Sequence, residues 1–359
     1  MPETTPHDLE SVIRDWDGEA SIARFDRESG AWIFIALHST ALGPALGGTR
    51  MRIYPTPADG LRDAQRLAES MTSKWATLEQ PMGGGKAVLA IPAPLEGEAR
   101  RGLLRRYGRL VESLRGTFGT GEDLGTTPED LAVVAESTRY VHGVEPGGSV
   151  TDPGPFTARA VRRGIEAAVR HVLARDDLRG VTVLVQGVGD VGYPLARELA
   201  ELGARLLVSD VDSGRIERAV TTLGATAVAP EEAWDAPCDV FAPCAIGGVL
   251  SSSTIPRLQC RIVAGSANAQ LETREDEARL AERGIVYVPD YVVNAGGAYA
   301  FALLGRGEHD EATLFGRMDY VGEIVAAVLA ESKAEGTSPL EAAGRRVARA
   351  LSRGRAPAS

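Results

Sequence analysis

The feature that most restricts the fold of this chain is a glycine-rich turn between a buried strand and a helix. The apolar run Val181–Val185 leads into the sequence GVGDVG at positions 187–192, and a helical pattern then extends to about Leu202. A second apolar strand, Arg205–Ser209, follows and ends at Asp210. This order of elements is typical of a parallel α/β sheet that binds a dinucleotide, because the helix N-terminus accommodates a pyrophosphate.

Polar residues at the expected carboxyl edge of this sheet add detail to the predicted cofactor site. In the turn itself we expect the cofactor to contact Gly187, Gly189, Asp190, Val191 and Gly192. Asn268 and Asn294 follow two further strand patterns, and ligands bind at that edge. Asp210 would accept hydrogen bonds from a ribose 2′-hydroxyl and repel a 2′-phosphate, so it predicts NAD rather than NADP. A solvent-facing turn aspartate is the alternative interpretation.

The length and charge of the chain limit its organisation and its partners. With 359 residues, 44% of them hydrophobic, the chain can fill two domain cores. Acidic residues (49) outnumber basic ones (39) and no dense basic run occurs, which disfavours nucleic acid as a partner. The chain lacks an apolar stretch of about 18 residues and a leader of the secretory type, so we expect a cytoplasmic protein with no membrane partner. The spacing of the three cysteines predicts no metal site.

The turn-rich segment 143–154 is predicted to connect two domains. We therefore expect a two-domain α/β protein in which residues 1–150 form an α/β substrate-binding and oligomerisation domain. Residues 151–324 are expected to form a Rossmann-type NAD-binding domain. Helices are predicted over 311–335 and 339–353, and the chain from about 325 to 359 is expected to pack back on the first domain.

Two lysines occupy positions where burial is expected. Lys74 lies within the apolar stripe of a helix predicted over 61–78, although a lysine there could bury its stem and extend its ammonium to water. Lys86 follows three glycines, which would let the backbone approach a ligand, and precedes a strand-like run, so its side chain is expected at a strand end. A phosphate-binding loop is excluded, because Gln80 and Ala87 stand where that motif needs a glycine and a hydroxyl residue.

Asp123 is a third candidate for chemistry. It follows a short strand-like run and precedes a helix start capped by Thr127. The neighbouring Glu122 is a rival candidate, and an ordinary turn aspartate is an equally consistent interpretation. A lysine that is crowded by another cation and shielded from water tends to lose its proton and can act as a base, so two lysines can divide two tasks.

Seven segments together resemble the leucine, valine and phenylalanine dehydrogenases of the glutamate dehydrogenase superfamily. Their order and spacing fit over roughly residues 20–350, which is far more specific than any single motif. The segments are Ala41–Arg50, Met82–Leu89, Gly121–Thr127, Val185–Gly192, Ala242–Gly248, Ala264–Gln270 and Val288–Gly297.

The resemblance implies a homo-oligomer that uses NAD to deaminate an L-amino acid oxidatively to a 2-oxo acid and ammonia. By matching position, Lys74 would hold the substrate carboxylate with help from Gly47 and Gly48. Lys86 would activate the water that attacks the iminium carbon. Asp123 would exchange protons with the amino group.

The resemblance also implies which residues contact the nicotinamide and the substrate side chain. Thr157 and Asn268 would lie near the nicotinamide. Met71, Ala298 and Phe301 would contact the substrate side chain, and the last two stand where leucine-type enzymes tend to have valines. Because no charged residue is evident at the pocket positions 298 and 301, we expect an apolar substrate, leucine or valine first and phenylalanine or another aromatic amino acid second.

Several positions depart from the family pattern. Ser73 and Trp75 replace the usual tyrosine and asparagine around the first lysine, Ala269 replaces an asparagine, and His142 replaces the threonine of aliphatic-specific members. A non-catalytic NAD-binding regulatory relative is an alternative, but such a protein would not need both lysines and the aspartate. A hydroxy-acid dehydrogenase is a third possibility, and it would need a histidine or comparable base in place of the lysine pair.

Overall fold

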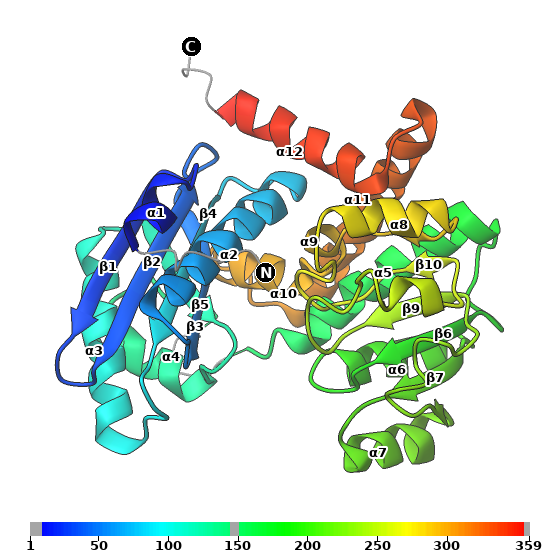
Figure 1. Ribbon diagram of the computed structural model, residues 1–359, viewed down its shortest axis with the longest axis horizontal. Helices are drawn as coiled ribbons and strands as arrows, with labels where there is room; N and C mark the ends of the chain where they lie inside the picture. The colour runs from blue at the N-terminus through cyan, green and yellow to red at the C-terminus, as the bar shows by residue number, and fades with distance from the viewer. Residues whose placement is uncertain (1–8, 144–150, 355–359) are drawn as a thin grey trace, which may run out of the picture. The chain divides into compact units, whose positions relative to one another are not determined.

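The computed structural model describes residues 9–143 and 151–354, which form two compact units (Figure 1). The first unit contains the described residues up to Thr151, residues 304–306 and the described residues from Val347 onward. The second contains Asp152–Leu303 and Gly307–Arg346. Most of the predicted connection at 143–154 lies outside the described residues.

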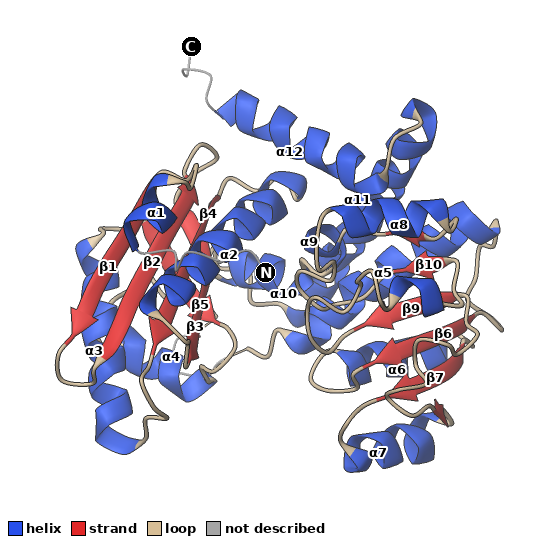
Figure 2. Ribbon diagram, in the orientation of Figure 1, coloured by secondary structure: helices blue, strands red, loops and turns tan. Residues whose placement is uncertain are grey.

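A mixed five-stranded sheet forms the centre of the first unit (Figure 2). Its spatial order is β1-β2-β4-β3-β5. β3 is parallel to β4 and β5, whereas β2 is antiparallel to β1 and β4. The strands are β1 (Ala20–Asp26), β2 (Ala31–Ser39), β3 (Ala45–Arg52), β4 (Gly83–Ala90) and β5 (Phe118–Glu122), and the helices are α1 (Leu9–Arg14), α2 (Pro57–Thr77), α3 (Gly97–Ser113) and α4 (Pro128–Ala135).

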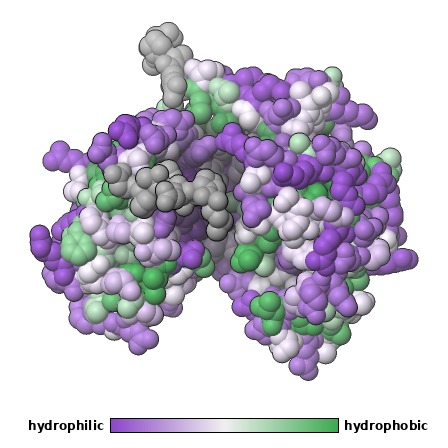
Figure 3. Space-filling model, viewed as in Figure 1, coloured by the Kyte–Doolittle hydropathy of each residue, from purple (hydrophilic) through white to green (hydrophobic). Residues whose placement is uncertain are grey.

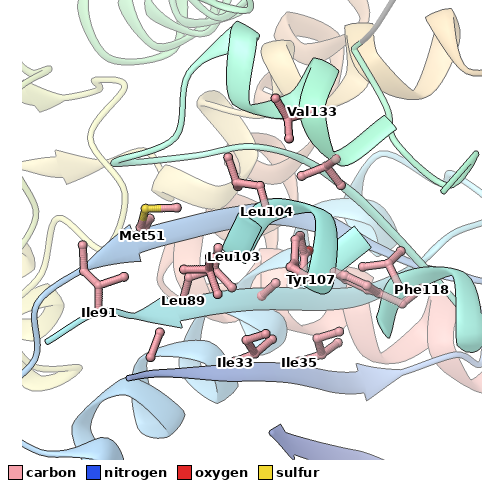
Figure 4. Close-up of a cluster of buried hydrophobic side chains, with 14 of the residues drawn as sticks. Ile33, Ile35, Met51, Leu89, Ile91, Leu103, Leu104, Tyr107, Phe118 and Val133 are labelled. Atoms are coloured by element: carbon pink, nitrogen blue, oxygen red, sulfur yellow. The ribbon is translucent and has the colours of Figure 1, made fainter. Parts of the chain in front are cut away.

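Apolar side chains fill both faces of this sheet, as the alternation of a strand requires. Leu89 packs with Leu103 and Tyr107 of α3 in the cluster of Figure 4. The next residue on the other face, Val88, packs instead with Leu61 and the alanines of α2. Side chains at even positions of β4 therefore point towards α2, and Lys86 is one of them.

Capping residues define where α2 begins. The side chain of Thr56 accepts a hydrogen bond from the backbone N–H of Asp59, whose carboxylate accepts one from the Thr56 backbone in return. Pro57 occupies the first helical position, where its missing N–H costs little. These reciprocal bonds satisfy N–H groups that a helix start otherwise leaves unpaired, so α2 begins at Pro57, as the sequence Thr56-Pro57-Ala58-Asp59 predicts. α4 begins in the same way after Thr127.

A parallel six-stranded sheet forms the centre of the second unit, in the order β11-β10-β9-β6-β7-β8. The strands are β6 (Thr182–Gln186), β7 (Arg205–Ser209), β8 (Thr226–Ala227), β9 (Val240–Pro243), β10 (Ile262–Val263) and β11 (Val286–Tyr287). The helices are α5 (Gly154–Leu173), α6 (Gly192–Glu201), α7 (Ser213–Leu223), the short η1 (Ile255–Arg257), α8 (Glu275–Glu282), α9 (Asp290–Val293), α10 (Gly296–Leu304), α11 (Glu311–Glu335) and α12 (Pro339–Gly354). The predicted two-domain α/β fold with a Rossmann-type sheet is confirmed.

The strand order of this second sheet reverses at β6. From β6 the chain passes to β7 and β8 on one side, and then returns to β9, β10 and β11 on the other. Ligands bind at the carboxyl edge of such a sheet, where the order reverses. The turns after β6 and β9 meet there, since a Cβ atom on Gly187 would be 2.7 Å from the Cβ of Ala245.

The C-terminal helices differ in part from the expectation. α11 packs along α5 within the second unit, because its buried face, which includes Met318, Val321 and Val325, is apolar. Residues 307–346 therefore belong to the second unit, and only those from Val347 group with the first. The sequence predicts that the chain packs on the first domain from about residue 325, which is earlier than the structure shows.

Hydrophilic side chains cover most of the face shown in Figure 3, and hydrophobic ones are scattered among them. Val211, Ile246 and Leu124 are the most exposed of the large hydrophobic residues described, at 92%, 72% and 61%. None of the helices within 9–143 and 151–354 combines the length and the apolar character needed to cross a membrane.

Candidate active site

Three charged side chains from neighbouring strands meet on the α2 face of the first sheet. Lys86 lies inside β4, Arg50 lies on β3, and Asp123 directly follows β5. Lys86 Nζ is 2.9 Å from Asp123 Oδ1, and Arg50 Nε donates a hydrogen bond to Asp123 Oδ2 at 2.8 Å. Both carboxylate oxygens of Asp123 therefore bind a cation. Asp123, rather than the rival Glu122, is the acid in contact with Lys86.

Burial and neighbouring charges set the protonation of this pair. Burial by itself raises the pKa of Asp123, but the charges of Lys86 and Arg50 outweigh it and hold that pKa at about 2. Burial lowers the pKa of Lys86, and the charge of Arg50 lowers it further, whereas Asp123 opposes the change. Asp123 is therefore ionised, and Lys86 gives up its proton more readily than an ordinary lysine, as a general base must.

The glycines before Lys86 have a different role from the expected one. Gly83–Gly85 pair within the sheet, so Lys86 lies inside β4 instead of at a strand end. A Cβ atom on Gly84 would be 2.0 Å from Oγ1 of Thr72 on α2, and one on Gly85 would be 2.8 Å from the Phe118 ring. These glycines therefore allow close contact between parts of the protein, and they bring α2 near the strand that contains Lys86.

Close packing also explains Gly47 and Gly48 on β3. A Cβ atom on Gly47 would be 1.8 Å from the carbonyl oxygen of Gly85. A Cβ atom on Gly48 would be 2.4 Å from the carbonyl oxygen of Glu122 and 2.9 Å from the Cβ of Asp123. Any larger residue at 48 would displace Asp123 from its position beside Lys86. The implied contact of both glycines with a substrate carboxylate stays a prediction.

Lys74 and Met71 lie on α2, the helix that covers this face. Lys74 is buried, at 7% exposure, and Met71 is half-buried with its Cγ 3.4 Å from the position of a Cβ on Gly47. Trp75 Nε1 donates a hydrogen bond to the carbonyl of Leu46 at 3.0 Å, which fixes α2 against β3. The departure from the family pattern at Trp75 therefore provides a buried anchor for the helix. The substrate contacts of Lys74 and Met71 stay predictions.

Lysine usage is a signal that the sequence interpretation missed. Only three of the 39 basic residues in the sequence are lysines, namely Lys74, Lys86 and Lys333. The first two are buried, although lysine is among the residues that are least often buried. Arginine can replace lysine as a surface cation but cannot give up its proton in a protein. Burial of two of only three lysines is therefore unusual in such an arginine-rich chain, and it sets Lys74 and Lys86 apart.

In the second unit, the glycine turn after β6 fits a bound pyrophosphate. Gly187 has a φ of 89°, which favours glycine, and a Cβ atom on Gly192 would be 1.8 Å from the Gly187 carbonyl oxygen. A Cβ atom on Gly189 would meet only the end of the Arg215 side chain, at 3.0 Å, so a ligand can approach this backbone. The N-cap of α6 is Val191, whose side chain makes no capping hydrogen bond. An anion can therefore occupy this helix start.

Asp210 lies beside the glycine turn, and Asp190 is exposed within it. Asp210 Oδ2 accepts a hydrogen bond from the Val188 N–H at 2.8 Å, and Oδ1 accepts one from the Asp212 N–H at 2.9 Å. Each carboxylate oxygen has a further lone pair, so Asp210 can also accept a ribose hydroxyl. The exposed Val211, which follows it, offers apolar surface to a planar base. These residues fit a dinucleotide.

Three other residues predicted at the cofactor site make hydrogen bonds at the same edge. Asn294 Nδ2 donates to Asn268 Oδ1 at 2.9 Å, so the two predicted asparagines lie together. Asn294 Oδ1 is buried with no hydrogen-bond partner within the described parts of the chain. Thr157 Oγ1 donates to the Pro153 carbonyl and accepts from the Gly297 N–H, both at 3.0 Å, which joins α5 to α10. The contacts of Thr157 and Asn268 with a nicotinamide, and the contact of Asn294 with the cofactor, stay predictions.

The remaining pocket candidates are divided between the units. Ala298 and Phe301 lie on α10 of the second unit, where Phe301 is 8% exposed. In the first unit, a Cβ atom on Gly119 would be 2.6 Å from Nε2 of His142. His142 Nδ1 is buried, and none of the described residues pairs with it. Burial lowers the pKa of His142 and favours a neutral ring. The substrate contacts of Ala298 and Phe301 stay predictions.

Comparison with known proteins identifies relatives of both units. Residues 25–140 match the Glu/Leu/Phe/Val dehydrogenase dimerisation domain, and residues 210–303 match the glutamate/leucine/phenylalanine/valine dehydrogenase domain. The leucine dehydrogenase of Thermoactinomyces intermedius is 44% identical over 297 residues, which cover 82% of this chain and 80% of that protein. The L-tryptophan dehydrogenase of Nostoc punctiforme is 42% identical over 341 residues, which cover 94% of each.

The similarity extends to a solved structure. The crystal structure of L-tryptophan dehydrogenase from Nostoc punctiforme superposes with a TM-score of 0.82 at 38% identity and covers 96% of this chain and 99% of that one. The resemblance inferred from the sequence is therefore confirmed over nearly the whole chain. Enzymes of this group are amino acid dehydrogenases that use a nicotinamide cofactor, and the chain belongs to the Glu/Leu/Phe/Val dehydrogenase family.

Proposed function

We propose that this protein catalyses the reversible, NAD-dependent oxidative deamination of an apolar L-amino acid of the leucine or valine type. The observation that supports this most is the buried contact between Lys86 and Asp123 in a chain that is 44% identical to a leucine dehydrogenase. One amino acid, one NAD⁺ and one water give one 2-oxo acid, one ammonium ion, one NADH and one proton.

The residues of the first unit would divide the steps on the substrate. Lys74 would hold the substrate carboxylate, and the nicotinamide, when bound, supplies the redox chemistry by accepting the α-hydrogen as hydride. Lys86 in its neutral form would take a proton from the water that adds to the iminium carbon. Asp123, whose carboxylate is held between Lys86 and Arg50, would exchange a proton with the amino group as ammonia leaves.

We propose NAD rather than NADP because a carboxylate stands where a 2′-phosphate would lie. Asp210 follows β7 and contacts the backbone of the glycine turn. Its negative charge would repel a 2′-phosphate, whereas a free 2′-hydroxyl would donate to it. Thr157, Asn268 and Asn294 would position the nicotinamide end of the cofactor.

An aromatic amino acid is the second candidate substrate. The L-tryptophan dehydrogenase of Nostoc punctiforme is 42% identical to this chain, which is within the 40–44% range of the leucine dehydrogenases. The buried, neutral His142, where aliphatic-specific members carry threonine, favours the same candidate. A regulatory relative without turnover is disfavoured, because binding alone does not need a base beside a carboxylate.

The test is a screen of the purified protein with NAD and each of the twenty amino acids, in which NADH and ammonia are measured together. We expect the largest kcat/KM with leucine or valine, measurable values with several other apolar amino acids, and little activity with glutamate or aspartate. Preference for an aromatic amino acid would favour the second candidate, and preference for glutamate would refute the proposal. The dimerisation-domain match at 25–140 supports a homo-oligomer, and a cytoplasmic location stays a prediction.

A further inference from the structure

A row of alternating charges extends from Lys86 through the α2 face of the first sheet. Lys86 contacts Asp123, Asp123 contacts Arg50, and Arg50 Nη1 contacts Asp63 Oδ2 on α2 at 3.0 Å. All four side chains are less than one fifth exposed. The Tyr54 hydroxyl also donates to Asp63 Oδ2, at 2.7 Å. The row contains two cations and two anions, so its buried charges balance.

Arg50 is the member of this row that fixes the others. It lies on β3, between β4 with Lys86 and the end of β5 with Asp123. Its planar guanidinium is held at both ends, by Asp123 through Nε and by Asp63 through Nη1. A side chain held in this way directs Asp123 Oδ2 towards itself and leaves Oδ1 facing Lys86.

Charge at Arg50 and charge at Asp63 act on Lys86 in opposite directions. The positive charge of Arg50 favours the neutral form of Lys86, and the negative charge of Asp63 favours its protonated form. Asp123 faces Lys86 from the end of β5 and also favours the protonated form. Besides Asp63, the charged residues on α2 are Asp59, Arg62, Arg66, Glu69 and Lys74. Arg66 contacts Asp63 from the surface at 2.8 Å, and Arg62 pairs with Asp59.

We propose that Arg50 is a positioning residue and that Arg50 and Asp63 together set how readily Lys86 gives up its proton. This inference depends on the proposed function only for the task of Lys86 as the base. Arg50 holds the Asp123 carboxylate in place and adds the positive charge that favours a neutral amine. Asp63 holds Arg50 and limits that effect.

The scarcity of lysine permits a direct test that does not require turnover. Acetic anhydride acetylates only neutral amines, and the chain offers Lys74, Lys86 and Lys333 besides its N-terminus. The extent of acetylation at Lys86 is measured by peptide mass spectrometry over a range of pH, with the exposed Lys333 as the internal reference. The variants are Arg50→Gln and Asp63→Asn.

Arg106→Gln is the matched control. Arg106 belongs to the same unit, is 13% exposed against 12% for Arg50, and likewise contacts two acids, Asp26 and Glu28. This ion-pair cluster does not include Lys86, Arg50 or Asp123. The control therefore reproduces the loss of a buried arginine without the loss of the charge beside the base.

We expect the acetylation curve of Lys86 to move to higher pH in Arg50→Gln, to lower pH in Asp63→Asn, and to stay in place in Arg106→Gln. At a fixed pH on the rising part of the curve, each shift should change the extent of labelling by several-fold. The acidic limb of kcat against pH should move in the same two directions. Arg50→Lys keeps the charge but cannot hold both acids, so its curve should stay near that of the wild type while kcat falls.

Three results would overturn the inference. They are acetylation curves of Lys86 that are the same in all variants, curves that move in the same direction in Arg50→Gln and Asp63→Asn, and no acetylation of Lys86 at any pH. If Arg50→Gln does not fold, Asp63→Asn and Arg50→Lys still decide it. If the opposite shifts occur but no amino acid is oxidised, the proposed function fails and the charge arrangement stands. If amino acids are oxidised but the shifts are absent, the proposed function stands and the inference about Arg50 and Asp63 fails.

Discussion

Replacing Asp123 by asparagine should destabilise the protein at neutral pH, because it removes the anion between two buried cations. Asp123 lies 2.9 Å from Lys86 and 2.8 Å from Arg50. Removal of one partner from a buried ion pair typically costs about 3–5 kcal/mol. Arg50 keeps Asp63 as a partner, so most of the cost falls on Lys86.

Lys86 can reduce this cost by giving up its proton, and the saving depends on pH. An unfolded lysine has a pKa of about 10.4, so deprotonation costs about 5 kcal/mol at pH 7 and about 2 kcal/mol at pH 9. When the folded-state pKa of Lys86 is depressed, the unfolded state binds more protons between the two pKa values, and stability rises with pH in that window. Asp123 opposes the lowering of the Lys86 pKa in the wild type, so this pKa is lower still in Asp123→Asn. We therefore expect the stability deficit of Asp123→Asn relative to the wild type to shrink between pH 7 and pH 9, by at most about 2–3 kcal/mol.

The assay is urea unfolding of both proteins at equal concentration at the two pH values. Asp26→Asn is the matched control, because Asp26 is 4% exposed and pairs with Arg106 in the same unit. Arg106 cannot lose its proton in this pH range. The free energy of unfolding that Asp26→Asn loses relative to the wild type should therefore be the same at pH 7 and pH 9. A deficit of Asp123→Asn that does not change with pH, or a variant as stable as the wild type, would refute the reasoning.

Three further outcomes are expected at individual residues. Lys86→Arg should keep the positive charge but lose the base, so turnover should fall by about 10²–10⁴-fold while NAD binding, measured by calorimetry, is retained. Asp210→Ser should raise kcat/KM with NADP relative to NAD, and a wild type that uses both cofactors equally would contradict the charge argument. Gly48→Ala should displace Asp123, whose Cβ would be 2.9 Å from the new methyl group, so kcat should fall more than thermal stability; unchanged kcat would show that this contact does not matter.

The elements with a strong periodic pattern could be predicted from the sequence. The strand at 205–209 and the helix at 311–335 have the expected bounds in the structure. The sequence predicts Lys86 at a strand end, because three glycines precede it and a strand-like run follows, but β2 and β3 pair with those glycines on both sides. Local sequence does not reveal such pairing, which depends on distant strands.

The chemistry at the candidate site could be predicted only in part. Lys74, Lys86 and Asp123 stand out because their types and neighbours are unusual for their positions. Arg50 and Asp63 do not stand out, since one belongs to an ordinary strand and the other to the polar side of a helix start. They meet only because β3 lies between β4 and β5, and the sequence does not state that order.

The position of β3 in the sheet also has a consequence for the order of folding. β5 pairs only with β3 among the named strands, through contacts such as Ala45 with Phe118, which close a long loop. Contacts between residues far apart in the chain form slowly, so β5 should join the sheet after the β1–β2 hairpin and α2 have formed. Until then the amine of Lys86 has no acid beside it. The time at which Lys86 becomes protected from acetylation during refolding would therefore report when β5 joins the sheet.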